Sequence, residues 1–283
     1  LYTISFTTPQ GQINVNLADD LTGGDTISGT LEKVSAGKTD SERAKTQAEL
    51  NHYIVEWGQQ QTSVAEKSLT RNIPVAPTTT DRMIRLLRNG REVARTELPI
   101  SSAPKPTPTD FILPTGAQQG KLIEVTGSCD GLFRNTDYIK IGETSLPILA
   151  ESPRKKIGRD TSETVGPTKI ESGENGRMAE CPFRNLGIQL SAGKLSLLKG
   201  ETTTLHLVVI GLAGISEDVP LELVNQSPGV ISMSGGESQH MIINASAVRE
   251  AGSYTIDRML TGVTAGSFGI TATVKWSNVC THP

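Results

Sequence analysis

The sequence has little cysteine: its 283 residues contain only Cys129, Cys181 and Cys280. An odd number excludes complete pairing within the chain, and no two of the three stand at the CxxC spacing of a zinc site. The four histidines are equally scattered, without the i, i+2 or i, i+4 spacing of metal ligands. We therefore expect neither a metal site nor any other cofactor.

The chain also lacks an excess of either charge and any long apolar run. Lys and Arg number 27 against 30 Asp and Glu, a net charge of −3, which provides no basic surface for nucleic acid or anionic lipid. No apolar stretch approaches the ~20 residues of a membrane-spanning helix. Neither an initiator methionine nor a signal peptide is present, and we interpret this as removal of a signal peptide from a secreted or cell-surface protein.

Aromatic residues make up only 4% of the chain, which argues against the sugar-stacking cleft of a glycosidase. No G-x-S-x-G nucleophile motif occurs, and no pair of carboxylates stands out as catalytic, so we expect no enzyme activity. Tyr53 and Trp57 alternate within one segment, and they are either core residues or an exposed platform for binding. Trp276 continues the buried face of the last predicted strand and is expected in the core.

What the sequence does contain is a succession of short β-prone runs. Seven of them follow one another in residues 186–283, separated by Gly, Pro, Asn and Ser at the spacing of about 8–12 residues that is typical of a sandwich. Apolar side chains alternate along the last run from Phe268 to Trp276, so one face of that strand must be buried. This pattern predicts an immunoglobulin-like sandwich.

Two boundaries divide the chain. Pro104, Pro106 and Pro108 alternate with Lys and Thr, which favours an extended linker over a helix or a central strand. A second boundary is expected where one strand ends near Phe183 and a new alternating pattern begins at Leu186 without a spacer. The prediction is an all-β chain of three tandem immunoglobulin-like sandwiches: residues 1–100, then a linker at 101–109, then residues 110–185 and 186–283.

The first hundred residues combine strand-like runs with one polar segment. Residues 40–51 are rich in helix formers and begin at a plausible cap, Asp40 or Ser41, which predicts a short helix or a long surface excursion. Asn89-Gly90 is a strong signal for a β-hairpin. The arrangement resembles the carboxypeptidase-regulatory or transthyretin-like sandwich of surface proteins.

The middle segment contains "LPTGAQQGKLIEVTGSCDGLF", then "YIKIG" and "LPILAESP". These stretches resemble IPT/TIG-type immunoglobulin-like domains, from which the segment departs by placing Cys129 just after a strand. The matching positions are Pro114, Gly116, Gly120, Gly127, Phe133 and Ile139–Gly142. Through "DTISGTL", "AELNHYIVEW", "LPILAESPRK" and "LELVNQSPGVISMSGG", the whole chain resembles secreted bacterial proteins with such domains in tandem. The resemblance implies spacers, adhesive surfaces or assembly units rather than an activity.

Cysteine pairing is open to more than one interpretation. Cys129 and Cys181 stand at opposite ends of the middle segment, where a disulfide would stabilise a small core by roughly 4 kcal/mol. We favour this pair for a secreted chain, which leaves Cys280 unpaired or linked to another chain. Pairing of Cys280 with Cys129 or with Cys181 remains an alternative.

The segment Asp19–Asp25 places three carboxylates around two glycines. Such a loop could supply oxygen ligands to calcium, but it lacks the D-x-D-x-D rhythm and a bidentate Glu at a matching offset. A turn, in which Asp and Gly are favoured for backbone reasons, is the preferred interpretation, and calcium binding remains open.

The opening strand supplies the leading hypothesis for function. Tyr2, Ile4 and Phe6 alternate in "LYTISFTT", so the segment is expected to be an edge strand, either of its own sandwich or of a neighbouring copy. The sequence thus indicates a non-enzymatic structural protein that self-associates through this strand in a surface or filamentous assembly. One alternative is a monomeric adhesin whose loops bind an extracellular glycan or protein. A second is a set of accessory domains of an extracellular hydrolase.

Overall fold

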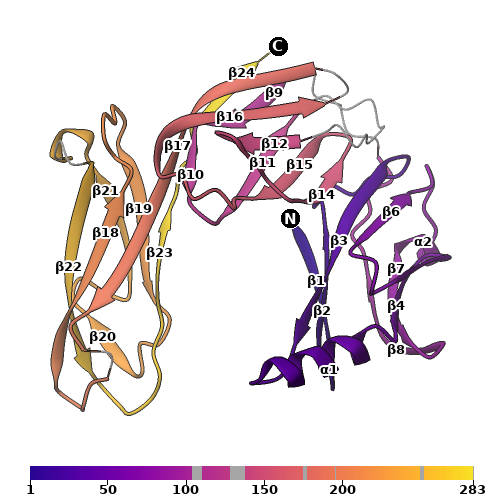
Figure 1. Ribbon diagram of the computed structural model, residues 1–283, viewed down its shortest axis with the longest axis horizontal. Helices are drawn as coiled ribbons and strands as arrows, with labels where there is room; N and C mark the ends of the chain where they lie inside the picture. Colours follow the sequence, from indigo (N-terminus) through magenta and orange to yellow (C-terminus); the bar gives the residue numbers. More distant parts are fainter. Residues whose placement is uncertain (104–109, 128–137, 175–176, 195, 249–251, 283) are drawn as a thin grey trace.

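The computed structural model describes residues 1–103, 110–127, 138–174, 177–194, 196–248 and 252–282. Strands dominate it, and the prediction of an all-β chain built from sandwiches is confirmed. Figure 1 shows the first and third sandwiches extending from the same side of the middle one, so that the molecule forms an arch. None of the described helices is long and apolar enough to cross a membrane.

In the first sandwich, strands β1, β2, β3 and β6 lie over a second layer with the order β5-β4-β7-β8. The predicted helix is α1, and its capping box joins Thr39 and Glu42, so the cap precedes the expected Asp40 or Ser41. The predicted hairpin at Asn89-Gly90, where both residues have positive φ, joins β7 to β8. The elements are β1 (Tyr2–Thr8), β2 (Gly11–Leu17), β3 (Thr26–Ser35), α1 (Asp40–Leu50), β4 (Tyr53–Trp57), β5 (Gln60–Ser63), β6 (Ser68–Asn72), α2 (Thr79–Arg82), β7 (Met83–Arg88) and β8 (Arg91–Glu97).

In the middle sandwich, strands with the order β14-β15-β11-β9-β24 lie over β13-β12-β16-β17, with β10 pairing to β17. Residues 104–109 of the linker, Cys129 and Phe133 lie outside the described residues. The elements are β9 (Phe111–Pro114), β10 (Gly116–Gln118), β11 (Leu122–Thr126), β12 (Tyr138–Ile141), β13 (Thr144–Ser145), β14 (Ile148–Ser152), β15 (Lys155–Arg159), β16 (Gly166–Glu174) and β17 (Arg177–Ala192).

In the third sandwich, the end of β17 continues the order β17-β18-β22-β20, and a three-stranded layer β21-β19-β23 covers it. All seven β-prone runs expected here are strands. The further elements of this sandwich are β18 (Thr202–Ile210), β19 (Val219–Asn225), β20 (Ile231–Met233), β21 (Ser238–Ile243), a 3₁₀ turn (Ala245–Ala247), β22 (Ser253–Gly262) and β23 (Ile270–Val274). After them comes β24 (Val279–His282), which belongs to the middle sandwich. Three separate clusters of buried apolar side chains correspond to the three sandwiches.

Strand β17 belongs to both the middle and the third sandwich. Its first part pairs with β16 and its last part with β18, so the prediction that a strand ends near Phe183 is wrong. The backbone continues without a break, and only the side-chain alternation changes: Phe183 packs in the middle core and Leu186 in the third. Between them, the amide of Asn185 is buried and donates to Asp160 Oδ2 at 2.8 Å and Ser162 Oγ at 2.9 Å.

A second sheet runs through the other junction. Strand β3 pairs with β14 at Gly29↔Ala150 and Ser28↔Glu151, which joins the first and middle sandwiches in one nine-stranded sheet. That sheet ends in β24, which pairs with β9. The prediction that all of residues 186–283 belong to the third domain does not hold for these last residues, which pair in the middle one.

Candidate binding site

The aromatic pair considered as an exposed binding platform is in the first core. Tyr53 is 1% exposed and Trp57 3% exposed. Their polar atoms bond internally: Tyr53 Oη to Gln10 Oε1 at 2.5 Å, and Trp57 Nε1 to the carbonyl of Asp81 at 2.9 Å. The binding interpretation of this pair is therefore wrong, because both rings fill the space between two sheets.

The predicted assembly strand pairs within its own sheet. Strand β1 lies antiparallel to β2 over its full length, and Ile4 and Phe6 are buried in the first core, with Tyr2 packed against them. The sequence allowed this strand to pair either in its own sandwich or with a neighbouring copy, and in the structure it pairs in its own sandwich. Removal of β1 to pair with a neighbour would therefore expose the first core.

The disulfide joins Cys181 to Cys280 and not Cys129 to Cys181. Strand β24 runs beside β9 in the layer opposite β17, and this position brings the two sulfurs together across the middle core. The favoured pairing and the unpaired role of Cys280 are therefore corrected. Cys181 and Cys280 are 99 positions apart, and pairing over such a distance leaves no local signal in the sequence.

The carboxylates considered for calcium bind cations of the protein instead. Arg154 Nε donates to Asp20 Oδ2 at 2.9 Å, and its Nη2 donates to the carbonyl of Asp20 at 3.0 Å and to Asp25 Oδ2. Lys155 Nζ contacts Asp19 Oδ1 at 2.9 Å. These contacts join the loop of the first sandwich to the turn between β14 and β15. The loop is thus a clamp between two sandwiches.

Burial and charge act in opposite directions at this clamp. Burial of Arg154 disfavours its charged form, but the hydrogen bonds and charges of Asp25 and Asp20 outweigh burial and raise the pKa of the guanidinium. The hydrogen bond from Lys155 is the main reason why the pKa of Asp19 lies below its usual value. Among the described residues, no group of three or more His, Cys, Asp or Glu side chains could hold a metal ion.

One His–Asp pair was not foreseen from the sequence. His206 Nδ1 lies 2.7 Å from Asp257 Oδ1, with Ser191 opposite His206 on the neighbouring strand. All three are exposed on one face of the sheet, whereas acyl transfer depends on donors held around an oxyanion away from water. The arrangement is that of cross-strand surface pairs, which only the strand register reveals.

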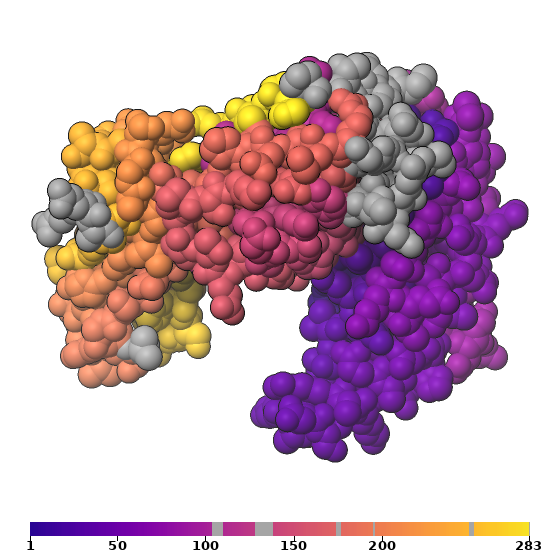
Figure 2. All heavy atoms as spheres, turned by 45° about the horizontal axis from the view of Figure 1, so that its top comes forward, coloured from indigo at the N-terminus to yellow at the C-terminus, as the bar shows by residue number. Residues whose placement is uncertain are grey.

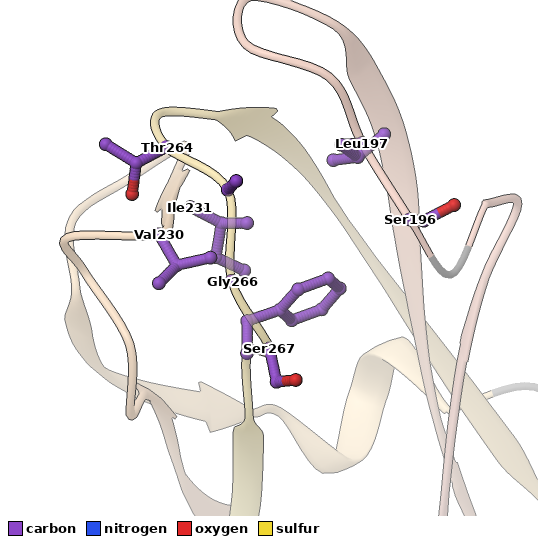
Figure 3. A pocket seen from close by; sticks show the side chains of 9 residues that line it. Ser196, Leu197, Val230, Ile231, Thr264, Gly266 and Ser267 are labelled. Atoms are coloured by element: carbon purple, nitrogen blue, oxygen red, sulfur yellow. The ribbon is translucent and has the colours of Figure 1, made fainter.

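A pocket of about 510 Å³ opens at one end of the third sandwich; we call it the tip pocket (Figure 3). Three separate loops form it: the one before β18, the one before β20, and the one between β22 and β23. Figure 3 shows Ser196 and Leu197 across the opening from Thr264 and Val230. Its lining residues are Ser196, Leu197, Val230, Ile231, Thr264, Ala265, Gly266, Ser267 and Phe268.

The tip pocket is uncharged. Leu197, Val230, Ile231 and Phe268 give it apolar walls, and the third core continues directly beneath them. Hydroxyl groups lie at its rim, of which Thr264 Oγ1 donates to the carbonyl of Gly229 at 2.7 Å. With no titratable side chain among the lining residues, the pocket can hold a ligand but cannot supply a general acid or base.

Comparisons with known proteins found only weak structural similarities. No protein-family model matches the sequence, and no curated protein matches it. Similar solved structures include SGBP-B from a xyloglucan utilization locus in Bacteroides uniformis, at 10% identity and a TM-score of 0.30, covering 99% of this chain and 98% of that one. The Escherichia coli adhesin FdeC has 12% identity and a TM-score of 0.23 over 99% of this chain and 98% of its own. Similarity this low carries no information about ligands or partners.

Proposed function

We propose that this chain is a non-enzymatic binding protein of the cell exterior whose tip pocket takes a small uncharged ligand, such as the end of a neutral glycan. One observation carries the proposal: apolar walls and a hydroxyl rim surround the same space without any charge. Apolar side chains with a few placed polar groups are typical of small-molecule sites. The Cys181–Cys280 disulfide supports an oxidising, extracellular location.

The proposal is tested by calorimetric titration of the full chain with a panel of neutral oligosaccharides. Ser267→Trp fills the pocket from an exposed position without removing a core side chain, and we expect it to abolish binding. Met259→Ala, exposed on β22 and outside the pocket lining, is the matched control. Equal binding by Ser267→Trp and the unmodified chain would overturn the assignment of the site, and no binding by any neutral glycan would overturn its ligand class.

A second candidate function is self-association, favoured by the open edge of β1. This strand ends the nine-stranded sheet, and its seven residues contain neither a charge nor a proline, the features that commonly protect such edges. Edge-to-edge pairing with another copy would keep Ile4 and Phe6 in their own core. Ser5→Lys should then convert an oligomer, measured by mass photometry, to a monomer, and an unmodified monomer would remove the candidate.

We also propose that the three buried clusters mark three domains, with β24 belonging to the second, and that this middle domain is IPT/TIG-like. Support comes from the motif positions that the structure describes: Gly120 and Gly142, both with positive φ, stand in turns before β11 and after β12. Limited proteolysis of the full chain tests the boundaries, because cleavage is expected first in the linker at 101–109.

A further inference from the structure

Two surface pockets lie at the two junctions of the arch and meet. One, of about 530 Å³, lies between the first and middle sandwiches and is lined by Thr3, Asn14, Glu32 and Arg159 among others. The other, of about 220 Å³, lies between the middle and third sandwiches and is lined by residues of β10, β11 and β23 together with Trp276. Both contain Lys121 and Leu122. They therefore form one elongated surface, which we call the concave groove.

The groove lies on the inner side of the arch. Figure 1 shows β1 and β23 facing each other on the side where the N-terminus is drawn, with β10 and β11 of the middle sandwich between them. Figure 2 shows the same side as a deep concavity between the first and third sandwiches. A ligand in the groove would touch all three sandwiches, whose relative positions the continuous sheets fix.

One end of the groove carries a fixed aromatic ring. Trp276 is partly exposed, and its Nε1 donates to Thr115 Oγ1 at 3.0 Å. The indole lies so close to Gly116 that a Cβ there would be 2.6 Å from its Cε2. A ring held in this way loses little conformational entropy when it contacts a ligand.

The other end presents an amide donor. Asn14 Oδ1 accepts hydrogen bonds from Ser5 Oγ at 2.9 Å and from Gln12 Nε2 at 2.7 Å, and two donors on this atom fix the orientation of the amide. Its Nδ2 has no acceptor among the described residues, and Asn14 lines the groove, so this amide is available as a donor. Glycan hydroxyls and carboxylates are acceptors for such a group.

The centre of the groove has one cation without an opposite charge. Glu32 pairs with Arg159 at 3.4 Å and Glu124 with Lys155 at 2.9 Å. Lys121 is exposed between the two pockets, and it has no ion-pair partner in the part of the chain that the structure describes. Beside it, the apolar side chain of Leu122 is 44% exposed.

We propose that the concave groove binds an extended acidic oligosaccharide, with one sugar face on Trp276, a carboxylate at Lys121 and hydroxyl groups at Asn14. A sugar ring combines an apolar face with polar edges, which matches an aromatic ring followed by a donor and an ammonium. A single sugar would fill one pocket only, whereas the shared residues make the site continuous. This site is separate from the tip pocket and does not depend on the function assigned to it.

The test is calorimetric titration of the full chain with hexamers of galacturonic, mannuronic and glucuronic acid. The fully methyl-esterified galacturonate hexamer serves as the uncharged counterpart of the same chain. We expect one site per molecule for an acidic hexamer, weaker binding of its ester, and a loss of affinity with added salt. Lys121→Met should weaken binding about fivefold, and Trp276→Ala at least about tenfold.

Three further variants separate the role of the groove from general damage. Lys45→Met removes an exposed lysine on α1 that is not among the lining residues of either pocket, and it should bind like the unmodified chain. Ser267→Trp should also leave this binding unchanged, and Trp276→Phe should retain most of it with an intact melting curve. The proposal is overturned if no acidic hexamer binds at millimolar concentration, or if Lys121→Met and Trp276→Ala bind like Lys45→Met. Capture of extended peptides instead of sugars would overturn it as well.

Discussion

At the residue scale, the clamp between the first and middle sandwiches depends on the guanidinium of Arg154, which is 7% exposed. Arg154→Met would leave Asp20 and Asp25 without their cation, and breaking a buried pair from one side typically costs about 3–5 kcal/mol. We expect a loss of that size in the free energy of unfolding measured with urea. Arg43→Met, on the exposed face of α1, should change it by less than about 0.5 kcal/mol. Equal stability of the two variants would contradict the role of the clamp.

The carboxylate of Asp81 makes the stability of the fold dependent on pH. The backbone N–H and then the hydroxyl of Thr78 are the main causes that lower the pKa of Asp81, and Arg71, 2.9 Å away, adds to them. A carboxylate with a lowered pKa in the folded state stabilises the fold above its unfolded pKa, and this contribution is lost as the pH falls through the folded value. The melting temperature should therefore decrease once the pH is lowered beyond about 4.

Asp81→Asn should flatten this acid dependence in a series of melting curves from neutral pH downward. Asp40→Asn, at a fully exposed position of α1, is the control and should leave the decrease in melting temperature at low pH unchanged. If the melting temperature of Asp81→Asn decreases at low pH as steeply as that of the unmodified chain, other carboxylates are responsible for the acid dependence.

At the element scale, the Cys181–Cys280 disulfide fixes the last strand, β24, beside β9. It closes a loop of 99 residues, so the loop-entropy estimate gives it about 4–5 kcal/mol. Cys280→Ser should lower the urea midpoint accordingly and speed hydrogen exchange in β24 and β9. Peptide mapping without reduction should recover Cys181 linked to Cys280. A peptide that links Cys129 to Cys181 would contradict the structure.

Element prediction from the sequence succeeded where local chemistry alone decides. The helix at 40–51 needs only helix formers and a cap, and the Asn89-Gly90 hairpin needs only two residues that tolerate positive φ. It failed at β17, because a strand that passes from one core to the next changes its alternation without ending. The return of β24 was equally hidden, since pairing between distant segments leaves no local signal.

At the scale of the whole molecule, the two shared sheets predict a rigid arch. Small-angle scattering of the full chain should fit a single conformation with the dimensions of the structure. Arg154→Met removes the clamp at one junction, and it should raise the radius of gyration as the first sandwich gains freedom. Arg43→Met should scatter like the unmodified chain. A scattering curve that already requires several arrangements for the unmodified chain would refute the rigid arch.

The candidate sites also belong to this scale, which is why the sequence indicated so little of them. The tip pocket combines three loops, and the concave groove three sandwiches, so no single segment contains either. The alternation of Tyr53 and Trp57 fits a core strand and an exposed platform equally well, and both rings are buried. Trp276 was expected in the core, and it packs there only in part. The indole packs on Gly116, 160 positions away in the sequence.

The Cys181–Cys280 disulfide decides which part of the arch would bear a pulling force. Strands β1 and β24 form the two edges of the nine-stranded sheet, and a pull between Tyr2 and His282 therefore stretches the first and middle sandwiches. The covalent path leaves the backbone at Cys181 and rejoins it at Cys280. Residues 182–279 thus lie outside the line of tension. The third sandwich therefore bears no tension, and the tip pocket keeps its shape while the first and middle sandwiches are stretched.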